Sequence, residues 1–128
     1  SNPAAGAECS DQIPDGRIWR LISYRVQLVA AAAAASRRVH LVLGSAGTKF
    51  LDAFGSIDQI ISETKNYTFA AFPSLIDETD DNDILVPIPA DILLIKGDQL
   101  VTQTTAINAG DNFAAPTIYV EEYYVGFE

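Results

Sequence analysis

The chain has 128 residues, which is enough for one domain and too few for two ordinary ones. Hydrophobic residues make up 48% of the sequence and charged residues 20%, which excludes a disordered chain, a collagen-like repeat and a charged coiled coil. The single Cys excludes a disulfide framework and a Cys-based zinc site within one subunit. The formal net charge of −9 argues against nucleic-acid binding, because phosphates are bound mainly by Lys and Arg.

Charge is unevenly distributed along the sequence. Residues 1–49 hold six of the eight basic residues and three acids, whereas residues 50–128 hold two basic residues and 14 acids. If the fold keeps these halves on different surfaces, a basic face and an acidic face would suit docking between copies. The alternative is that the acids mainly keep the protein soluble.

Neither a targeting segment nor a membrane span is expected. Residues 1–10 lack the charged and apolar regions of a signal peptide. The longest apolar run, residues 28–35, has eight residues, whereas a membrane span needs about 18. We therefore expect synthesis in the cytoplasm, with no membrane partner and no nucleic-acid partner.

The N-terminal residues predict an extended arm. Residues 1–13 begin with small side chains and show no periodicity, so they cannot fold by themselves. We expect this arm to become ordered only by contact with a neighbouring subunit or a particle lattice. The folded domain is expected to cover residues 14–128.

Two strands follow this arm. Residues 22–28 alternate apolar and polar side chains, which predicts one face on a core and one face in water. Extending the segment back to Arg17 gives one long strand, or two strands with a bulge. Residues 37–43 repeat the alternation, with three apolar side chains on one face and Arg38 and His40 on the other.

Six consecutive alanines, residues 30–35, lie between these strands. Six residues flanked by strand sequence cannot offset the cost of helix nucleation, so we expect a strand end and a tight connection, with one helical turn as the alternative. A short helix is expected only at residues 56–62, where Ser56 can act as the N-cap and three isoleucines share a helical face.

Further strands, separated by turns rich in Gly, Asn, Asp and Pro, complete the pattern. They are expected at residues 49–54, 67–72, 84–86, 92–95, 99–107 and 117–127. About eight antiparallel strands with little helix predict an all-β, single-domain β-sandwich of the jelly-roll type. A small closed barrel is the alternative.

An acidic run at residues 77–83 offers the oxygen ligands that calcium prefers. In an EF-hand loop that begins at Asp77, Asn82 would fall where glycine is needed and Ile88 where the bidentate Glu belongs, so an EF-hand is excluded. A looser calcium site and a solvated acidic loop remain as alternatives. No cofactor and no other metal is expected.

The sequence predicts no enzymatic activity. His40 is the only histidine and no Gly-x-Ser-x-Gly motif accompanies it, so we expect an exposed or interfacial role. Cys9 is expected to be a bystander. Glu121 and Glu122 are adjacent on a strand and point to opposite faces, so they cannot act on one glycosidic bond. A cupin-like enzyme is disfavoured because such sites usually need several histidines.

Aromatic residues allow two interpretations. They can line a sugar-binding surface, or they can serve as core and interface anchors. The residues concerned are Trp19, Tyr67, Tyr119, Tyr123 and Tyr124.

The order of segments resembles a known class of proteins. Its elements are the turn and strand at residues 13–21, the strand start at 37–41, the strand and turn at 93–100, the turn at 107–111 and the closing strand at 119–123. Over residues 12–124 this arrangement resembles small all-β virion proteins of tailed bacteriophages, namely capsid decoration (cement) proteins and related tail or head appendage proteins.

The resemblance implies a non-enzymatic structural protein that binds the outside of a capsid and stabilises it. The implied partners are the major capsid protein or other virion proteins, the implied location is the virion, and the implied oligomer is a homotrimer. The alternative is a tail or head-fibre appendage module that binds a receptor or a carbohydrate. Besides the arm, the expected interface residues are Trp19, Arg20, Arg37, Arg38, Tyr119 and Tyr123.

Overall fold

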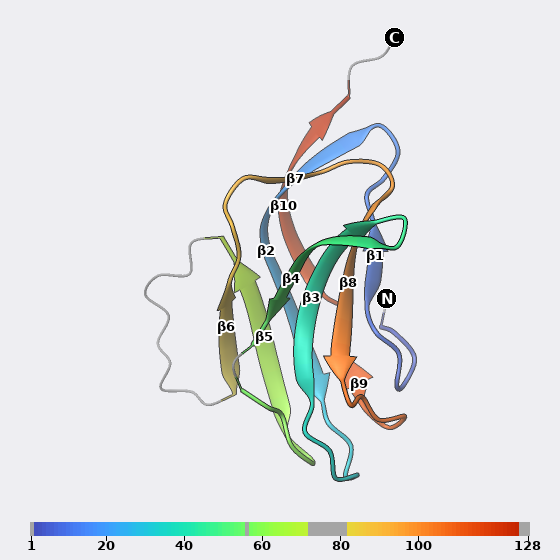
Figure 1. Ribbon diagram of the computed structural model, residues 1–128, viewed down its shortest axis with the longest axis vertical. Helices are drawn as coiled ribbons and strands as arrows, with labels where there is room; N and C mark the ends of the chain where they lie inside the picture. The colour runs from blue at the N-terminus through green and yellow to red at the C-terminus, as the bar shows by residue number, and fades with distance from the viewer. Residues whose placement is uncertain (1, 56, 72–81, 126–128) are drawn as a thin grey trace.

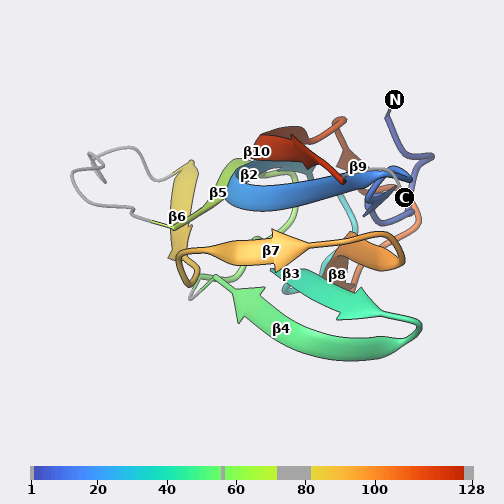
Figure 2. The ribbon, with the colours of Figure 1, turned by 90° about the horizontal axis from the view of Figure 1, so that it is seen from above.

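Two β-sheets pack face to face in the computed structural model, which describes residues 2–55, 57–71 and 82–125 (Figures 1 and 2). These residues contain ten strands and no helix, so the predicted β-sandwich is confirmed with more strands than expected. The strands are β1 (Ser10–Gln12), β2 (Arg17–Val29), β3 (Arg38–Ser45), β4 (Thr48–Phe54), β5 (Thr64–Ala70), β6 (Asp83–Pro87), β7 (Ile92–Leu94), β8 (Asp98–Thr105), β9 (Asn112–Phe113) and β10 (Thr117–Tyr124).

One sheet, which we call sheet A, has the strand order β1-β8-β3-β4, and the other, sheet B, has the order β10-β2-β5-β6. Two short strands, β7 and β9, also pair with β2. All pairs are antiparallel except β5 with β6, which is parallel and departs from the antiparallel jelly roll that we expected. Ala70 and Asp83 are separated by 12 residues, about the length that a connection between parallel strands requires.

Strand β2 is 13 residues long and lies between β10 and β5 in sheet B. It carries one irregularity. Leu21 and Tyr24 are both buried, although a spacing of three breaks strict alternation. The register with β10 shifts at this point, where consecutive β10 residues pair with Ser23 and with Leu21. Ile22 is therefore the extra residue of a bulge. Of the two alternatives, one long strand or two strands with a bulge, the structure has one long strand, and it contains the bulge.

The core lies between the sheets and contains apolar side chains from both of them. The alternation predicted for residues 37–43 is confirmed, since Val39, Leu41 and Leu43 are fully buried. The main core cluster is Cys9, Ile13, Leu21, Tyr24, Val26, Leu28, Val39, Leu41, Leu43, Tyr67, Phe69, Ile84, Val86, Ile88, Leu94, Leu100 and Phe113.

The N-terminal residues belong to the sandwich and are not a free arm. Strand β1 pairs with β8 at the edge of sheet A, and both Cys9 and Ile13 are buried in the core. The Glu8 carboxylate accepts hydrogen bonds from the Thr102 hydroxyl (2.8 Å) and the Thr104 amide (2.7 Å). The expectation that residues 1–13 become ordered only on a neighbouring molecule is therefore wrong, because β8 supplies the backbone partners within the same chain.

The prediction of a helix at residues 56–62 is also wrong for the residues of this range that the structure describes. Residues 57–62 are irregular, and Gln59 forms a β-bridge with Arg37, with N–O distances of 2.7 and 2.9 Å. These long-range hydrogen bonds replace the local ones of a helical turn. The expected cap Ser56 lies outside the described residues.

Most of the acidic run at residues 77–83 also lies outside the described residues. The same holds for the expected strand ends at Phe72 and Phe127. Asp83 is described and pairs with Arg25 at 3.5 Å.

Among the described residues, the two halves of the chain do not form separate basic and acidic faces. Strands β2 and β3 lie in the interior of their sheets, between strands of the acidic half. All six basic residues of the first 49 pair with acids from the rest of the chain. The pairs are Arg17–Glu122, Arg20–Glu121, Arg25–Asp83, Arg37–Asp111, Arg38–Asp58 and Lys49–Asp52.

Candidate functional site

Two loops lie side by side at one end of the sandwich, at the bottom of Figure 1. Residues 30–37, which we call the alanine loop, connect β2 to β3, and residues 57–63, which we call the isoleucine loop, lead into β5. Backbone hydrogen bonds join the loops, from Ala30 to the Glu63 carbonyl (2.8 Å) and from Ser62 to the Ala31 carbonyl (3.0 Å). The exposed apolar residues of this end form the apolar tip, which we define as Ala32, Ala33, Ala34, Ile57, Ile60 and Ile61.

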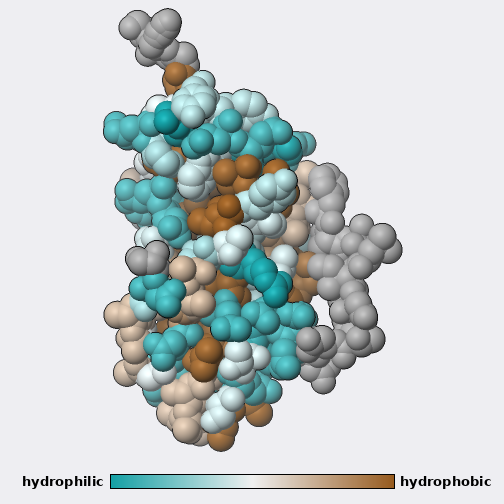
Figure 3. Space-filling view, turned by 180° about the vertical axis from the view of Figure 1, so that it is seen from behind, coloured by the Kyte–Doolittle hydropathy of each residue, from teal (hydrophilic) through white to brown (hydrophobic). Residues whose placement is uncertain are grey.

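The isoleucines of the apolar tip are about half exposed to solvent. Ile57, Ile60 and Ile61 are 48%, 52% and 44% exposed. Loops at protein surfaces are normally rich in polar and turn-forming residues. Full burial of one such side chain is worth about 1.5–3 kcal/mol, so covering this end with a partner is favourable. Figure 3 shows apolar colouring at the same lower end of the molecule.

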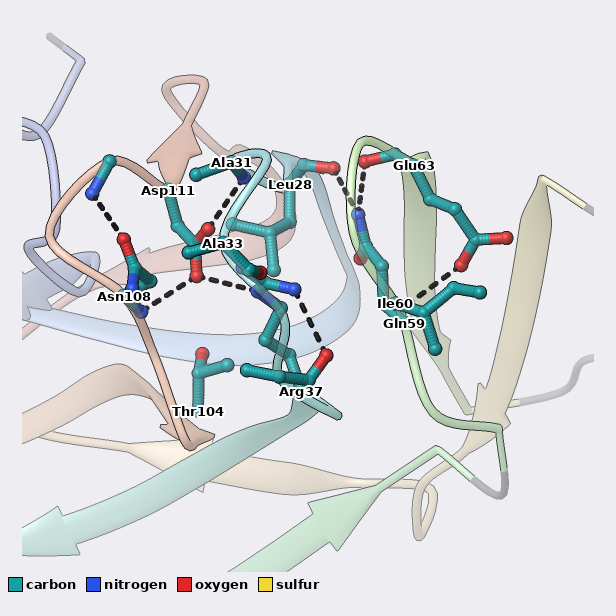
Figure 4. A network of polar contacts seen from close by, with 12 residues as sticks. Leu28, Ala31, Ala33, Arg37, Gln59, Ile60, Glu63, Thr104, Asn108 and Asp111 are labelled. Carbon is teal, nitrogen blue, oxygen red and sulfur yellow. Dashed lines mark hydrogen bonds and ion pairs between the residues drawn. The ribbon is translucent and has the colours of Figure 1, made fainter.

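A buried ion pair lies directly beneath the alanine loop (Figure 4). Arg37 and Asp111 are both fully buried, with 2.8 Å between Nε and Oδ2. The other guanidinium nitrogens donate to the carbonyls of Ala33 (2.9 Å) and Ala35 (3.0 Å). The loop is therefore wrapped around a fixed cation, which gives its exposed surface one conformation.

Asp111 ties this loop to the turn before β9. Its carboxylate accepts hydrogen bonds from the backbone amides of Ala31 (2.7 Å) and Asn108 (2.8 Å), besides that from Arg37. Burial disfavours the charged carboxylate, but the hydrogen bonds from Arg37 and from the two amides outweigh it and lower the pKa of Asp111. Asp111 consequently stays ionised at neutral pH.

Gln59 holds the isoleucine loop in place through hydrogen bonds of its side chain. Its buried amide donates to the carbonyls of Leu28 (2.8 Å) and Glu63 (2.7 Å), and its oxygen accepts from the Tyr67 hydroxyl (2.8 Å). Burial raises the pKa of Tyr67, so the phenol remains a donor at any physiological pH. Buried polar groups that are satisfied in this way specify a single arrangement of the backbone.

Ala31 of the alanine loop has a packing reason to be small. A Cβ placed on Gly110 would lie 3.0 Å from the Cβ of Ala31. The backbone of the alanine loop therefore approaches the turn around residue 110 at a point where larger side chains do not fit.

The charges that border the apolar tip cancel one another. Arg38 pairs with Asp58 at 2.8 Å, and Lys65 lies 3.9 Å from Glu63. The tip is thus a locally neutral end on a chain with a net charge of −9.

The structure divides the expected interface residues into two groups. Arg38 borders the apolar tip, whereas Arg37 is fully buried and cannot contact a partner, so its expected interface role is corrected to that of holding the alanine loop. The other four lie on β2 and β10. They are Trp19, Arg20, Tyr119 and Tyr123.

The β2 and β10 group forms a surface network. Trp19 donates to Glu122 (3.0 Å), Arg20 donates to Glu121 (3.1 Å), and the Tyr123 hydroxyl also donates to Glu121. These hydrogen bonds from Arg20 and Tyr123 lower the pKa of Glu121. Tyr119, on the same strand, is largely exposed.

Sequence reasoning missed the residues that build the tip. Ile57, Ile60 and Ile61 share a helical spacing, which concealed their role as exposed loop residues. Neither Gln59 nor Asp111 stands in a recognisable motif. The one available signal was the six-alanine connection, because a surface loop without Gly, Pro or a charge is uncommon.

Other candidates have structural explanations. Cys9 is buried, and burial raises its pKa to about 11, so the thiol is un-ionised at neutral pH. Tyr67 lies in the core and is not available for a sugar surface. Among the described residues there is no group of three or more side chains that could hold a metal ion. No helix in that part of the chain is long and apolar enough to cross a membrane.

Comparison with protein-family models, with curated proteins and with solved structures found no match.

Proposed function

We propose that this protein is a structural protein that docks its apolar tip on a larger protein assembly and stabilises that assembly. The observation that carries the proposal is the combination of three half-exposed isoleucines with a fully buried hydrogen-bond network beneath them. Preorganised surfaces bind better because little conformational entropy is lost on association. An apolar centre with a polar rim is the usual anatomy of a protein interface.

The assembly is a virion, and the protein is a capsid decoration protein of a tailed bacteriophage. Support for this assignment comes from the resemblance of residues 12–124 to small all-β virion proteins. The partner is the major capsid protein or another virion protein that offers an uncharged apolar depression. A neutral tip suits such a partner, because the remaining surface of an acidic chain is repelled by other acidic surfaces.

The proposed oligomer is a homotrimer. Strand β10 supports self-association, since among the described strands it pairs only with β2 and leaves its other edge open. Open strand edges are normally covered or paired, and Tyr119, Tyr123 and Tyr124 are exposed on this strand. Light scattering should give three times the mass of one chain, and a monomeric mass at high micromolar concentration would contradict the trimer.

The docking proposal is tested by rebinding to particles. Mass spectrometry of intact virions should detect this chain, and particles stripped of it should bind it again. The double variant Ile60→Asp/Ile61→Asp should bind at least about tenfold more weakly, as expected when interface anchors are lost.

The matched control is Leu93→Asp/Ile95→Asp. These side chains are exposed to a similar degree but lie on and after β7, outside the apolar tip. The control should bind like the unmodified protein. Loss of binding in the control alone, or absence of the chain from virions, would overturn the proposal.

A further inference from the structure

The outer face of sheet A carries a polar surface that docking through the apolar tip does not use. The strand register places Phe54 of β4, His40 of β3 and Gln103 of β8 in one row across the sheet. Asp52 lies opposite Val42 in the next row. Because alternate residues of a strand point to the same face, these five side chains share one side of the sheet.

Asp52 is the centre of this surface. Its carboxylate accepts hydrogen bonds from Nδ1 of His40 (2.8 Å) and from Nζ of Lys49 (3.2 Å). Partial burial opposes its ionisation, but these two hydrogen bonds outweigh that effect and lower the pKa of Asp52. The carboxylate is therefore an acceptor in a fixed position, and each oxygen keeps a free lone pair.

An aromatic ring extends the surface beside His40. The rings of Phe54 and His40 are stacked, with 5.1 Å between centroids and 29° between planes. Phe54 is nevertheless 53% exposed, so part of the ring is open to solvent. Stacking on the imidazole fixes the orientation of this exposed ring.

Two adjoining hollows run over these strands. The larger has a volume of about 250 Å³ and the smaller about 120 Å³, and they share Lys49 and Gln103. Both are smaller than the 300–1,000 Å³ typical of sites that enclose a small molecule. They suit a ligand that lies on the sheet and stays partly in water. The larger is lined by His40, Lys49, Asp52, Gln103, Thr104 and Thr105.

The chemistry of this surface fits a molecule with hydroxyl groups at its edges and an apolar C–H face. Asp52 accepts, Lys49 donates, and the Gln103 amide does both, which matches the alternating needs of neighbouring hydroxyls. The open ring of Phe54 can pack on C–H groups. A phosphate ligand fits poorly, because the central group is a carboxylate and Lys49 already pairs with it.

We propose that the outer face of sheet A binds a saccharide, with Asp52 and Gln103 hydrogen-bonded to ring hydroxyls and Phe54 packed on the C–H face of the sugar. The site is independent of docking through the apolar tip. In the appendage alternative, the protein is a module that contacts a receptor glycan. This site is the place in the fold where that glycan would bind.

Titration of the free, full-length chain with sugars tests this proposal by nuclear magnetic resonance. The probes are neutral di- and trisaccharides of glucose, galactose and N-acetylglucosamine at millimolar concentration, with inorganic phosphate as a separate arm. At least one saccharide should shift the backbone amides around His40, Asp52 and Gln103. Absence of localised shifts with every saccharide, or shifts there with phosphate alone, would overturn the proposal.

Variants sharpen the test. Asp52→Ala and Phe54→Ala should each weaken binding of the active saccharide at least about tenfold. The matched control is Phe50→Ala, on the same strand and equally exposed but without the ring contact that Phe54 makes with His40, and it should leave the affinity unchanged. The spectrum of each variant reports whether it is folded. Equal losses for Phe50→Ala and Phe54→Ala, or unchanged affinity in Asp52→Ala, would contradict the assigned contacts.

The saccharide titrations contain no virus particle. Their outcome is therefore independent of whether the protein docks through its apolar tip.

Discussion

Among the ion pairs of the described residues, only Arg37–Asp111 has both side chains fully buried. Both groups are fully buried, and the Asp111 carboxylate accepts hydrogen bonds from Arg37, Ala31 and Asn108, which shape this end of the sandwich. Removing one member of a buried pair leaves the other charge uncompensated. Exposed pairs behave differently, because water and salt screen them.

Replacement of Asp111 should therefore destabilise the protein strongly. We expect Asp111→Ala to lower the free energy of unfolding by about 3–5 kcal/mol. The control Asp15→Ala removes an exposed carboxylate that lies 3.5 Å from Lys96 and should cost less than about 1 kcal/mol. Urea denaturation measures both changes, and similar losses in the two variants would contradict the role given to the buried pair.

The same carboxylate makes stability depend on pH in the acid range. The pKa of Asp111 is lower in the folded protein than the value of about 3.9 in an unfolded chain. Its ionised form therefore stabilises the fold above about pH 4, and this contribution disappears as the pH falls through the folded pKa. The difference in unfolding free energy between the unmodified protein and Asp111→Asn should be largest near neutral pH and should shrink below pH 4. A constant difference down to about pH 2 would show that ionisation of Asp111 does not contribute.

At the scale of elements, short strands close the sandwich where the sequence offers no periodicity. Strand β1 has three residues, yet the segment around it places Cys9 and Ile13 in the core. Strand β9 has two residues and adds Phe113 to the same core. Segments this short are recognised only when their partners are known.

Truncation of Ile13 distinguishes a core segment from a surface arm. Ile13→Ala should lower the free energy of unfolding by about 2–4 kcal/mol, because a buried side chain leaves a cavity. Ile57→Ala makes the same change at an exposed position of the apolar tip and should cost less than about 1 kcal/mol. Thermal or urea unfolding compares the two. A negligible effect of Ile13→Ala would show that this segment is a peripheral arm, as the sequence predicted.

At the scale of the whole molecule, the basic residues of the first half are paired with acids of the second half, and a net charge of −9 remains. The basic strands β2 and β3 lie inside the sheets, and their charges pair with acids of the later strands. The basic residues of the first half therefore form no free basic surface that could orient a partner. In the docking that we propose, this leaves apolar contact as the source of affinity.

Salt dependence separates apolar docking from charge-driven docking. Raising sodium chloride from about 50 mM to about 500 mM shortens the range of electrostatic interactions to a few ångström. Binding to stripped particles should then change less than about threefold, since burial of the apolar tip does not depend on charge. A loss of more than about tenfold, measured by co-sedimentation, would show that charged groups dominate docking.

The sequence by itself determined the fold class and the long strands. Alternating side chains mark one buried and one solvated face, and this local signal identified β3 and the strand region of β2, where one long strand and two strands with a bulge remained as alternatives. Composition and turn residues were sufficient to predict a β-sandwich. That Val39, Leu41 and Leu43 face the core also followed from alternation alone.

The tertiary structure alone decided where the isolated polar residues and the short segments go. Gln59 became part of a buried network because a strand distant in sequence offered it backbone partners, and this prevented the helix that its neighbours favour locally. Arg37 and Asp111 are 74 residues apart, and Asp52 meets His40 only through the register of β3 and β4. Such contacts depend on which strands become neighbours, and periodicity within a strand contains no information about its neighbours.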